Sequence, residues 1–121
     1  MIKSTNNGKD WNVIYCFNGS DAFTLNFSFT DSNNGWYLNN NRTGNTVVHK
    51  TSDGGKSWNA VHTFTNHGDQ DYIHFLNIQI GYIVGRNGLL LKTTDGGVTW
   101  NSYSLAPSFL LEEIFFVNPD T

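Results

Sequence analysis

A ten-residue motif that occurs three times is the feature that most constrains the fold of this chain. Residues 92–101 read KTTDGGVTWN, and residues 50–59 read KTSDGGKSWN. A degenerate copy, KSTNNGKDWN, occupies residues 3–12, with Asn in place of the Asp and of the first Gly. The tryptophans of the three copies, Trp11, Trp58 and Trp100, are 47 and 42 residues apart. The chain is therefore predicted to consist of repeated structural units.

The repeat extends beyond the motif. Residues 27–36 align without gaps on residues 73–82, at an offset of 46, whereas the offset at the motif itself is 42. Four extra residues must lie between the two aligned segments, and the polar run at residues 39–45 is where we expect them. That run is predicted to form a lengthened hairpin loop.

Each repeat is predicted to contain four short strands. The expected strands are residues 23–29, 36–38, 47–51 and 58–64 in one unit, and 72–76, 81–84, 89–93 and 100–104 in the next. Short apolar runs between Gly, Asn and Asp clusters favour strands, and no window shows sustained helical periodicity. Partial units are expected at residues 1–17, which would end one unit, and at 111–121, which would begin another. The complete units span residues 23–64 and 71–104.

This period and strand pattern predict an all-β chain made of four-stranded antiparallel blades of a β-propeller. Propellers close with roughly four to eight blades, so two complete blades and two partial ones do not make a ring. We therefore expect a piece of a longer propeller, or an assembly of several copies. Open blade edges would also favour self-association.

Composition narrows the possible partners and cofactors. The 121 residues are 38% hydrophobic, enough for a packed core, but only 14% are charged and the net charge is −3. Nucleic acid is not an expected partner because there is no basic field, and no apolar run is long enough for membrane insertion. Cys16 is the single cysteine, and the four histidines lack metal-ligand spacing. No metal or cofactor is predicted.

A structural role in a hairpin is the favoured interpretation of the motif. Its Asp would accept hydrogen bonds from turn amides, its glycines would supply positive φ, and its Trp would pack on the sheet. Catalysis or calcium binding would instead require several carboxylates to converge on one site, and repetition in every unit argues against that. The residues assigned this structural role are Thr51, Asp53, Gly55, Trp58, Thr93, Asp95, Gly97 and Trp100.

The pattern Ser/Thr-x-Asp-x-Gly-x-Ser/Thr-Trp resembles the Asp box, or bacterial neuraminidase repeat, of sialidases, some endoglucanases and sortilin-type receptors. The longer string at residues 81–97 resembles the repeat of photosystem II stability and assembly factor-like propellers, which also occurs in bacterial secreted proteins. This resemblance implies a seven-bladed parent protein and an extracytoplasmic location. It carries information on fold more than on role, because proteins of many functions share the repeat.

Few residues offer catalytic chemistry. A sialidase needs an arginine cluster, and the chain has only Arg42 and Arg86. Glu112 and Glu113 are the only glutamates, and neighbouring residues on a strand point to opposite faces, so they do not form a facing pair. Asp69 and Asp71 could share one face at the start of a strand, where the preferred interpretation is a pair of solvated turn carboxylates. We predict no catalytic residue.

The leading hypothesis is a non-catalytic scaffold for protein–protein interaction, of the assembly-factor-like type. Its candidate binding residues are Arg86, Arg42, Asp69 and Asp71. The resemblance implies that arginines in such turns face a client protein. Two alternatives remain open at this point: a fragment of an Asp-box glycoside hydrolase, sialidase-like or xyloglucanase-like, that binds a glycan, and a structural repeat of a large secreted or cell-surface protein.

Overall fold

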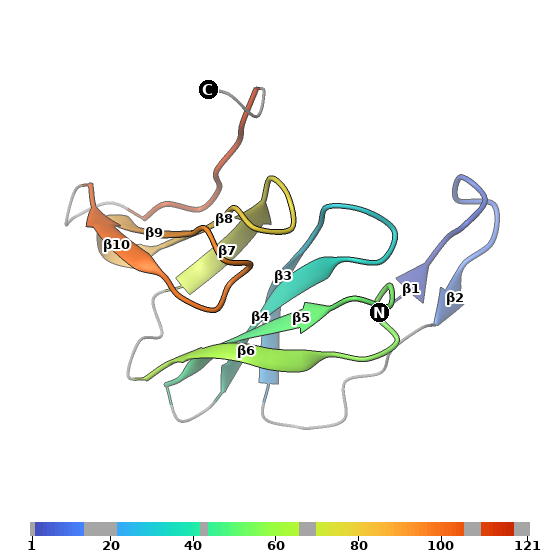
Figure 1. Cartoon of the computed structure of the whole chain (residues 1–121), viewed down its shortest axis with the longest axis horizontal. Helices are drawn as coiled ribbons and strands as arrows, with labels where there is room; N and C mark the ends of the chain where they lie inside the picture. Colours follow the sequence, from blue (N-terminus) through green and yellow to red (C-terminus); the bar gives the residue numbers. More distant parts are fainter. Residues whose placement is uncertain (1, 14–21, 42–43, 66–69, 106–109, 118–121) are drawn as a thin grey trace.

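Strands dominate the chain. The computed structural model describes residues 2–13, 22–41, 44–65, 70–105 and 110–117, and within these ranges the single helical element is one 3-10 turn. The first sheet contains β3 (Ala22–Phe29), β4 (Gly35–Asn41), β5 (Thr46–Thr51) and β6 (Asn59–Phe64), paired in chain order (Figure 1). All neighbouring strands in it are antiparallel. The predicted all-β fold of four-stranded antiparallel units is confirmed.

The second sheet repeats this arrangement. It contains β7 (Gln70–Phe75), β8 (Gly81–Gly85), β9 (Leu89–Thr93) and β10 (Asn101–Ser104), again antiparallel and in chain order. The 3-10 turn η1 (Arg86–Gly88) joins β8 to β9. A small N-terminal hairpin of β1 (Ile2–Lys3) and β2 (Asn12–Val13) precedes the first sheet.

The extra residues between the repeats lengthen two strands instead of forming only a loop, which corrects the prediction for residues 39–45. β4 continues to Asn41, and its end pairs with the start of β5, with Asn39 opposite Val47 and Asn40 opposite Thr46. The Thr46 hydroxyl also donates to Asn40 Oδ1 at 2.6 Å. The Asn40 side chain thus helps to continue the hairpin, because it adds a cross-strand hydrogen bond to the backbone pairing.

Both chain ends differ in part from the predicted strands. The strand expected after Trp11 covers Asn12–Val13, and residues 14–17 lie outside the described residues. At the other end, residues 110–117 contain no strand, and residues 118–121 again lie outside the described part. This C-terminal segment leaves the second sheet and projects from it, as Figure 1 shows.

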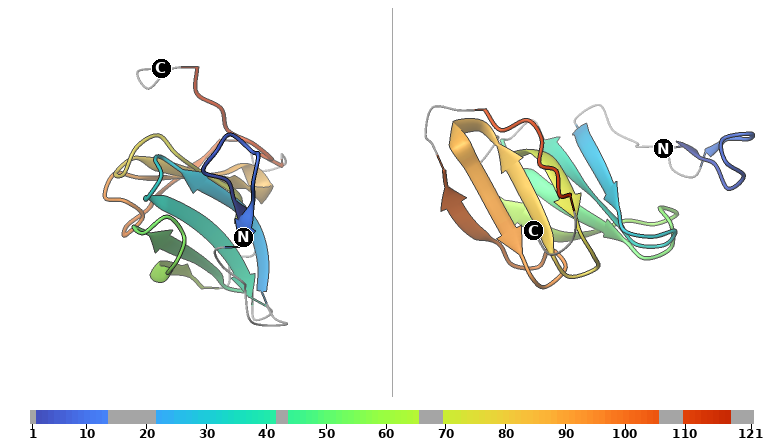
Figure 2. Two further views of the ribbon diagram at one scale, coloured as in Figure 1. Left: turned by 90° about the vertical axis from the view of Figure 1, so that its right-hand side faces the viewer. Right: turned by 90° about the horizontal axis from the view of Figure 1, so that it is seen from above.

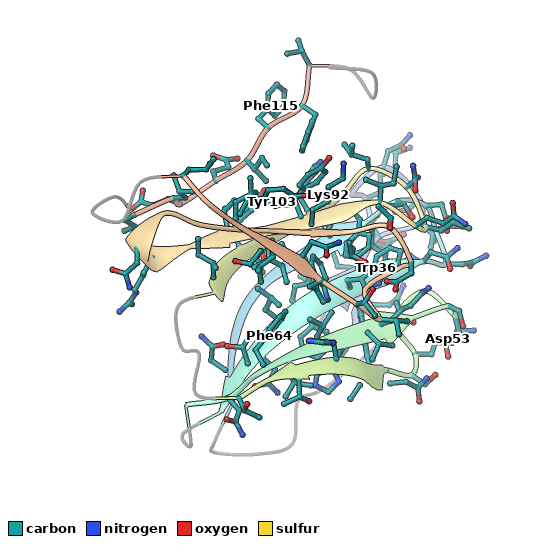
Figure 3. The ribbon with its side chains drawn as sticks, turned by 60° about the vertical axis from the view of Figure 1, so that its left-hand side comes forward. Trp36, Asp53, Phe64, Lys92, Tyr103 and Phe115 are labelled. Atoms are coloured by element: carbon teal, nitrogen blue, oxygen red, sulfur yellow. The ribbon has the colours of Figure 1, made fainter. Side chains whose placement is uncertain are left out.

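The two sheets stack face to face, and their first strands, β3 and β7, lie in contact (Figure 2). Because side chains alternate between the two faces of a strand, one face of each sheet supplies the core between them. The core comprises Trp36, Leu38 and Val48 from the first sheet and Ile73, Phe75, Ile83 and Leu91 from the second. Figure 3 shows Trp36 between the layers.

A glycine at the start of each second strand makes room for a phenylalanine of the first strand. A Cβ added to Gly81 would lie 2.6 Å from the ring of Phe75, and one added to Gly35 would lie 2.5 Å from the ring of Phe29. Each ring therefore rests on the backbone of its glycine. The glycine that precedes an aromatic residue in both repeats is explained by this contact.

Side-chain hydrogen bonds tie the first strands of the two sheets together. Asn26 in β3 accepts from the Ile73 amide at 2.8 Å and donates to the Ile73 carbonyl at 3.1 Å. The Ser28 hydroxyl accepts from the Phe75 amide at 2.8 Å. β3 and β7 are edge strands of two separate sheets. The side chains of Asn26 and Ser28 therefore satisfy backbone groups of β7 that a further strand would otherwise pair.

Candidate functional site

In the first sheet, the repeated motif forms the hairpin between β5 and β6. The Asp53 carboxylate accepts from the Ser57 hydroxyl at 2.6 Å, from the Ser57 amide at 3.0 Å and from the Thr51 hydroxyl at 2.8 Å. These hydrogen bonds, that of the Ser57 hydroxyl foremost, lower the pKa of Asp53 far below its ordinary value. Trp58 closes the turn by donating from Nε1 to the Gly55 carbonyl at 3.1 Å.

The second sheet holds the same arrangement between β9 and β10. Asp95 accepts from the Thr99 hydroxyl at 2.5 Å and from the Thr93 hydroxyl at 2.8 Å, and its pKa is lowered in the same way, mainly by Thr99. Trp100 Nε1 donates to the Gly97 carbonyl at 3.0 Å. Both carboxylates are thus engaged by their own turns, an arrangement that suits a structural role.

The degenerate motif in the N-terminal hairpin keeps this geometry with one hydrogen bond reversed. Asn6 stands at the Asp position and accepts from the Asp10 amide at 2.9 Å. Its Nδ2 then donates to the Asp10 carboxylate at 2.6 Å, where the other copies have a hydroxyl that donates to the aspartate. Asn6 at the Asp position and Asp10 at the Ser or Thr position therefore compensate each other, because donor and acceptor have exchanged places. Asn7 at φ 57 and Gly8 at φ 81 take the left-handed positions of the motif glycines.

The motif of the second sheet also joins that sheet to its neighbour. Trp36, fully buried in the first sheet, donates from Nε1 to the Gly96 carbonyl at 2.9 Å. The Lys50 ammonium lies 5.0 Å above the Trp36 ring. Within each sheet the motif is anchored as well, because the Gly54 and Gly96 amides donate to the carbonyls of Asn33 and Gln79, both at 2.9 Å.

The candidate binding residues of the sequence do not gather in one described site. Arg86 is exposed in η1, between β8 and β9. Arg42 and Asp69 lie outside the described residues, and of Asp71 only the backbone, in β7, is described. Glu112 and Glu113 are exposed in the C-terminal segment, and Asp31 is held in a turn by hydrogen bonds from Asn34 and Asn33.

The described part of the chain holds no metal-binding cluster. No group of three or more His, Cys, Asp or Glu side chains there is placed to hold a metal ion. His49 stacks on Tyr37 at 4.6 Å between ring centroids, and burial lowers its pKa. His62 Nδ1 lies 2.9 Å from the Val98 carbonyl of the neighbouring motif. These histidines serve packing and contact between sheets. Within the described ranges, none of the helical structure could span a bilayer.

An apolar cavity that the sequence did not reveal lies between the N-terminal hairpin and the first sheet. Its volume is about 340 Å³, and its lining is formed by Ile2, Lys3, Ser4, Trp11, Phe29, Asp31 and Ser32. It adjoins the face of the first sheet that points away from the second. On that face Phe27 is 36% exposed and Phe29 is 39% exposed. The sequence signal that bears on this face is the alignment of Phe29 with Phe75, which is buried in the second sheet.

These features define the class of protein. Two four-stranded antiparallel meanders, stacked through their first strands and each closed by the same hairpin motif, are consecutive blades of a β-propeller. The chain belongs to the family described as Photosynthesis system II assembly factor YCF48, whose sequence model matches residues 3–111. No curated protein matches the chain.

A solved structure described as YCF48 bound to D1 peptide is similar to this chain, with 32% sequence identity and a TM-score of 0.56. The match covers 72% of this chain and 27% of the solved chain. The chain therefore spans about a quarter of the length of that propeller. The match supports the propeller fold and the family together.

Proposed function

We propose that this chain is part of a non-catalytic propeller scaffold that binds a segment of another protein. The observation that carries this proposal is the similarity, at 32% identity, to a solved propeller described as bound to D1 peptide. The chemistry of the chain agrees, because Asp31, Asp53 and Asp95 are all engaged by their own turns. A catalytic carboxylate needs a free oxygen to exchange a proton with substrate.

Arg86 is the described residue best suited to contact a peptide. It is exposed in the turn between β8 and β9, at the end of the sheet opposite the motif. The turn is fixed on both sides, since the Leu105 amide donates to the Gly88 carbonyl at 3.3 Å and the Leu111 amide to the Gly85 carbonyl at 3.0 Å. A guanidinium on a fixed turn suits a carboxylate or the backbone carbonyls of a bound peptide.

A peptide titration tests this function. A fluorescein-labelled D1 peptide is titrated with the chain and followed by fluorescence anisotropy, with a scrambled D1 peptide as the reference. We expect saturable binding of the D1 peptide only, weakened roughly tenfold by Arg86→Ala, since one lost charge-assisted contact is worth about that much. Lys56→Ala, which removes an exposed cation in the motif of the first sheet, is the matched control.

Equal binding of the two peptides, or no saturation with either, would contradict the scaffold function. Hydrolysis of a fluorogenic sialoside or of xyloglucan by the purified chain would instead favour the glycoside hydrolase alternative.

We also propose an extracytoplasmic location, based on the resemblance of the repeat to secreted propellers. Fractionation of cells that express the native gene tests this location separately.

A further inference from the structure

Each complete motif contains an Asp-Gly pair, Asp53–Gly54 in the first sheet and Asp95–Gly96 in the second. This pair is chemically labile. The glycine nitrogen attacks the side-chain carbonyl carbon of a protonated aspartate, a C–N bond forms, and the carboxyl hydroxyl leaves as water with the amide proton. Water then opens the resulting succinimide at either carbonyl and gives aspartate or isoaspartate. Glycine favours the ring closure because it has no side chain to hinder the attack.

The fold requires glycine in both pairs. Gly54 and Gly96 have φ values of 74° and 75°, in the left-handed region. A Cβ added to Gly54 would lie 2.8 Å from the Ser32 carbonyl oxygen, and one added to Gly96 would lie 2.9 Å from the Ile78 carbonyl oxygen. A larger residue, which would slow ring closure, therefore does not fit, and each complete motif keeps the labile pair.

The carboxyl group that would be attacked is fixed through both of its oxygens. Asp95 Oδ1 accepts from the Thr93 hydroxyl at 2.8 Å and from the Val98 amide at 3.0 Å, and Oδ2 accepts from the Thr99 hydroxyl at 2.5 Å. Hydroxyls and amides hold Asp53 in the same way. Rotation of the carboxyl group toward the next nitrogen would break these bonds.

The same hydrogen bonds keep the two carboxylates ionised. The bond from the Thr99 hydroxyl is the main cause of the lowered pKa of Asp95, and the bond from the Ser57 hydroxyl has this role for the pKa of Asp53. An ionised carboxylate is the less reactive form, because the protonated group can release water and the ionised group cannot.

The attacking nitrogen is held as well. The Gly54 amide donates to the Asn33 carbonyl and the Gly96 amide donates to the Gln79 carbonyl, both at 2.9 Å. Each acceptor lies in the loop between the first and second strands of the same sheet. Both reacting groups of each pair are therefore bonded to partners other than each other.

Isomerisation would also damage the contact between the sheets. Isoaspartate adds a methylene group to the backbone, and at position 95 this addition would come directly before Gly96. The Gly96 carbonyl accepts from Trp36 Nε1 at 2.9 Å, and Trp36 is fully buried. A shift of this carbonyl would leave the indole N–H of Trp36 without its acceptor.

We propose that the hydroxyl groups of the complete motifs have a second role, which is to protect the Asp-Gly pair from succinimide formation and isomerisation. This role does not depend on the proposed peptide binding. Ser57 and Thr99 are the residues to test because both are exposed. Their replacement leaves the buried Thr51 and Thr93 in place.

An ageing experiment on the whole chain tests the proposal. The native chain, Ser57→Ala and Thr99→Val are kept at neutral pH and constant temperature for several weeks, and samples are digested with trypsin. Cleavage after lysine gives the peptides 51–56 and 93–121, each with a single Asp-Gly pair. Isoaspartate in each peptide is measured by mass spectrometry with electron-transfer fragmentation. Circular dichroism checks that the variants remain folded.

Each motif serves as the matched control for the other. Thr99→Val should accelerate isomerisation at Asp95 about tenfold, the factor that one charge-assisted hydrogen bond contributes to a rate, and should leave Asp53 unchanged. Ser57→Ala should have the reverse effect. The peptide acetyl-KTTDGGVTWN-amide, which copies residues 92–101 without the fold, should isomerise at least about tenfold faster than the same pair in the chain.

Equal rates in the peptide and the native chain would overturn the proposal, because the fold would then give no protection. Unchanged rates in the two folded variants would also overturn it, since the hydroxyl groups would not be the protecting groups. If one variant accelerated both pairs equally, protection would come from the stability of the whole fold, and the role assigned to the hydroxyl groups would be wrong.

Discussion

Phe75 and Phe29 occupy the same position in two successive sheets, yet their surroundings differ. Each rests on a glycine of the neighbouring strand. Phe75 is covered by Trp36 and is 4% exposed, whereas Phe29 faces a cavity and is 39% exposed. The repeat therefore specifies how each phenylalanine ring lies on its glycine. Contact with the aromatic residue of a neighbouring unit, as between Trp36 and Phe75, decides whether the ring is buried.

The polar groups show the same difference between the two regions. Between the sheets, Asn26 and Ser28 satisfy the buried amides of β7, and Trp36 satisfies the carbonyl of Gly96. On the open side, the Lys3 ammonium donates to the Ser32 carbonyl at 2.7 Å. One ammonium contact is more easily replaced by water than a set of buried bonds. We therefore expect the inner interface to dominate stability.

Substitution of Trp36 should have the largest effect. Trp36→Ala removes a fully buried indole and its hydrogen bond to Gly96, so the free energy of unfolding should fall by about 3 to 5 kcal/mol. Trp11→Ala, at a ring that is 61% exposed beside the open cavity, should cost about 1 kcal/mol or less. Urea denaturation followed by circular dichroism measures both, and equal losses would contradict the contrast between the two regions.

Asn26 provides the second test. Asn26→Asp keeps the shape but removes the donor to the Ile73 carbonyl and sets a carboxylate against that oxygen, which should lower the free energy of unfolding by about 1 to 3 kcal/mol. The same change at Asn59, which is exposed at the start of β6, serves as the control and should have little effect. If the two variants unfold at the same urea concentration, the bonds between β3 and β7 do not stabilise the interface.

The two glycines under the phenylalanine rings test how freely each ring can move. A methyl group at Gly81 would collide with the Phe75 ring, which Trp36 holds in place, and we expect a loss of about 1 to 3 kcal/mol for Gly81→Ala. Gly35→Ala should cost less, since the Phe29 ring is able to turn toward solvent. Denaturation midpoints give the order. A larger loss at Gly35 would mean that the Phe29 ring is not free to move.

Much of the architecture could be predicted from the sequence, because the repeat carries its own alignment. The predicted strand at residues 89–93 coincides with β9, and the other predicted strands in the two sheets start and end within a few residues of the observed ones. Local signals suffice here, as strands lie between Gly, Asn and Asp clusters and turn residues are repeated. The extension of β4 to Asn41 was missed because an Asn run is typical of loops, while its pairing with β5 and the hydrogen bond of Asn40 to Thr46 are visible only in the structure.

The candidate site was less accessible to sequence reasoning. Asn26 and Ile73 are 47 residues apart, and nothing in either local sequence shows that one satisfies the other. The cavity becomes evident only when the exposed fractions of Phe29 and Phe75 are compared in the structure, because the sequence contexts of the two residues are alike. Contacts of this kind depend on which units are neighbours in space, and the local sequence of one unit does not contain that information.

Acid should weaken the two complete motifs through their aspartates. Hydrogen bonds lower the pKa of Asp53 and Asp95 below the ordinary value of about 3.9. The folded state therefore holds these carboxylates ionised more strongly than the unfolded state does, and their contribution is present above about pH 4 and is lost as the pH falls through the folded pKa. Urea denaturation between about pH 6 and pH 2 should show this loss. The double variant Asp53→Asn, Asp95→Asn should be less stable at neutral pH and show a flatter profile.

The reversed hydrogen bond of the N-terminal hairpin gives the smallest but most specific test. Asn6→Asp alone sets a second carboxylate beside Asp10, and Asp10→Ser alone removes the acceptor of the Asn6 amide, so each single change should destabilise the hairpin. The double change restores the Asp and hydroxyl pair seen at Asp53 and Ser57. Because these groups are exposed, each effect should be less than about 1 kcal/mol, and hydrogen exchange of the Gly8 and Asp10 amides is the suitable measurement. Additive single effects would show that the two substitutions do not compensate each other.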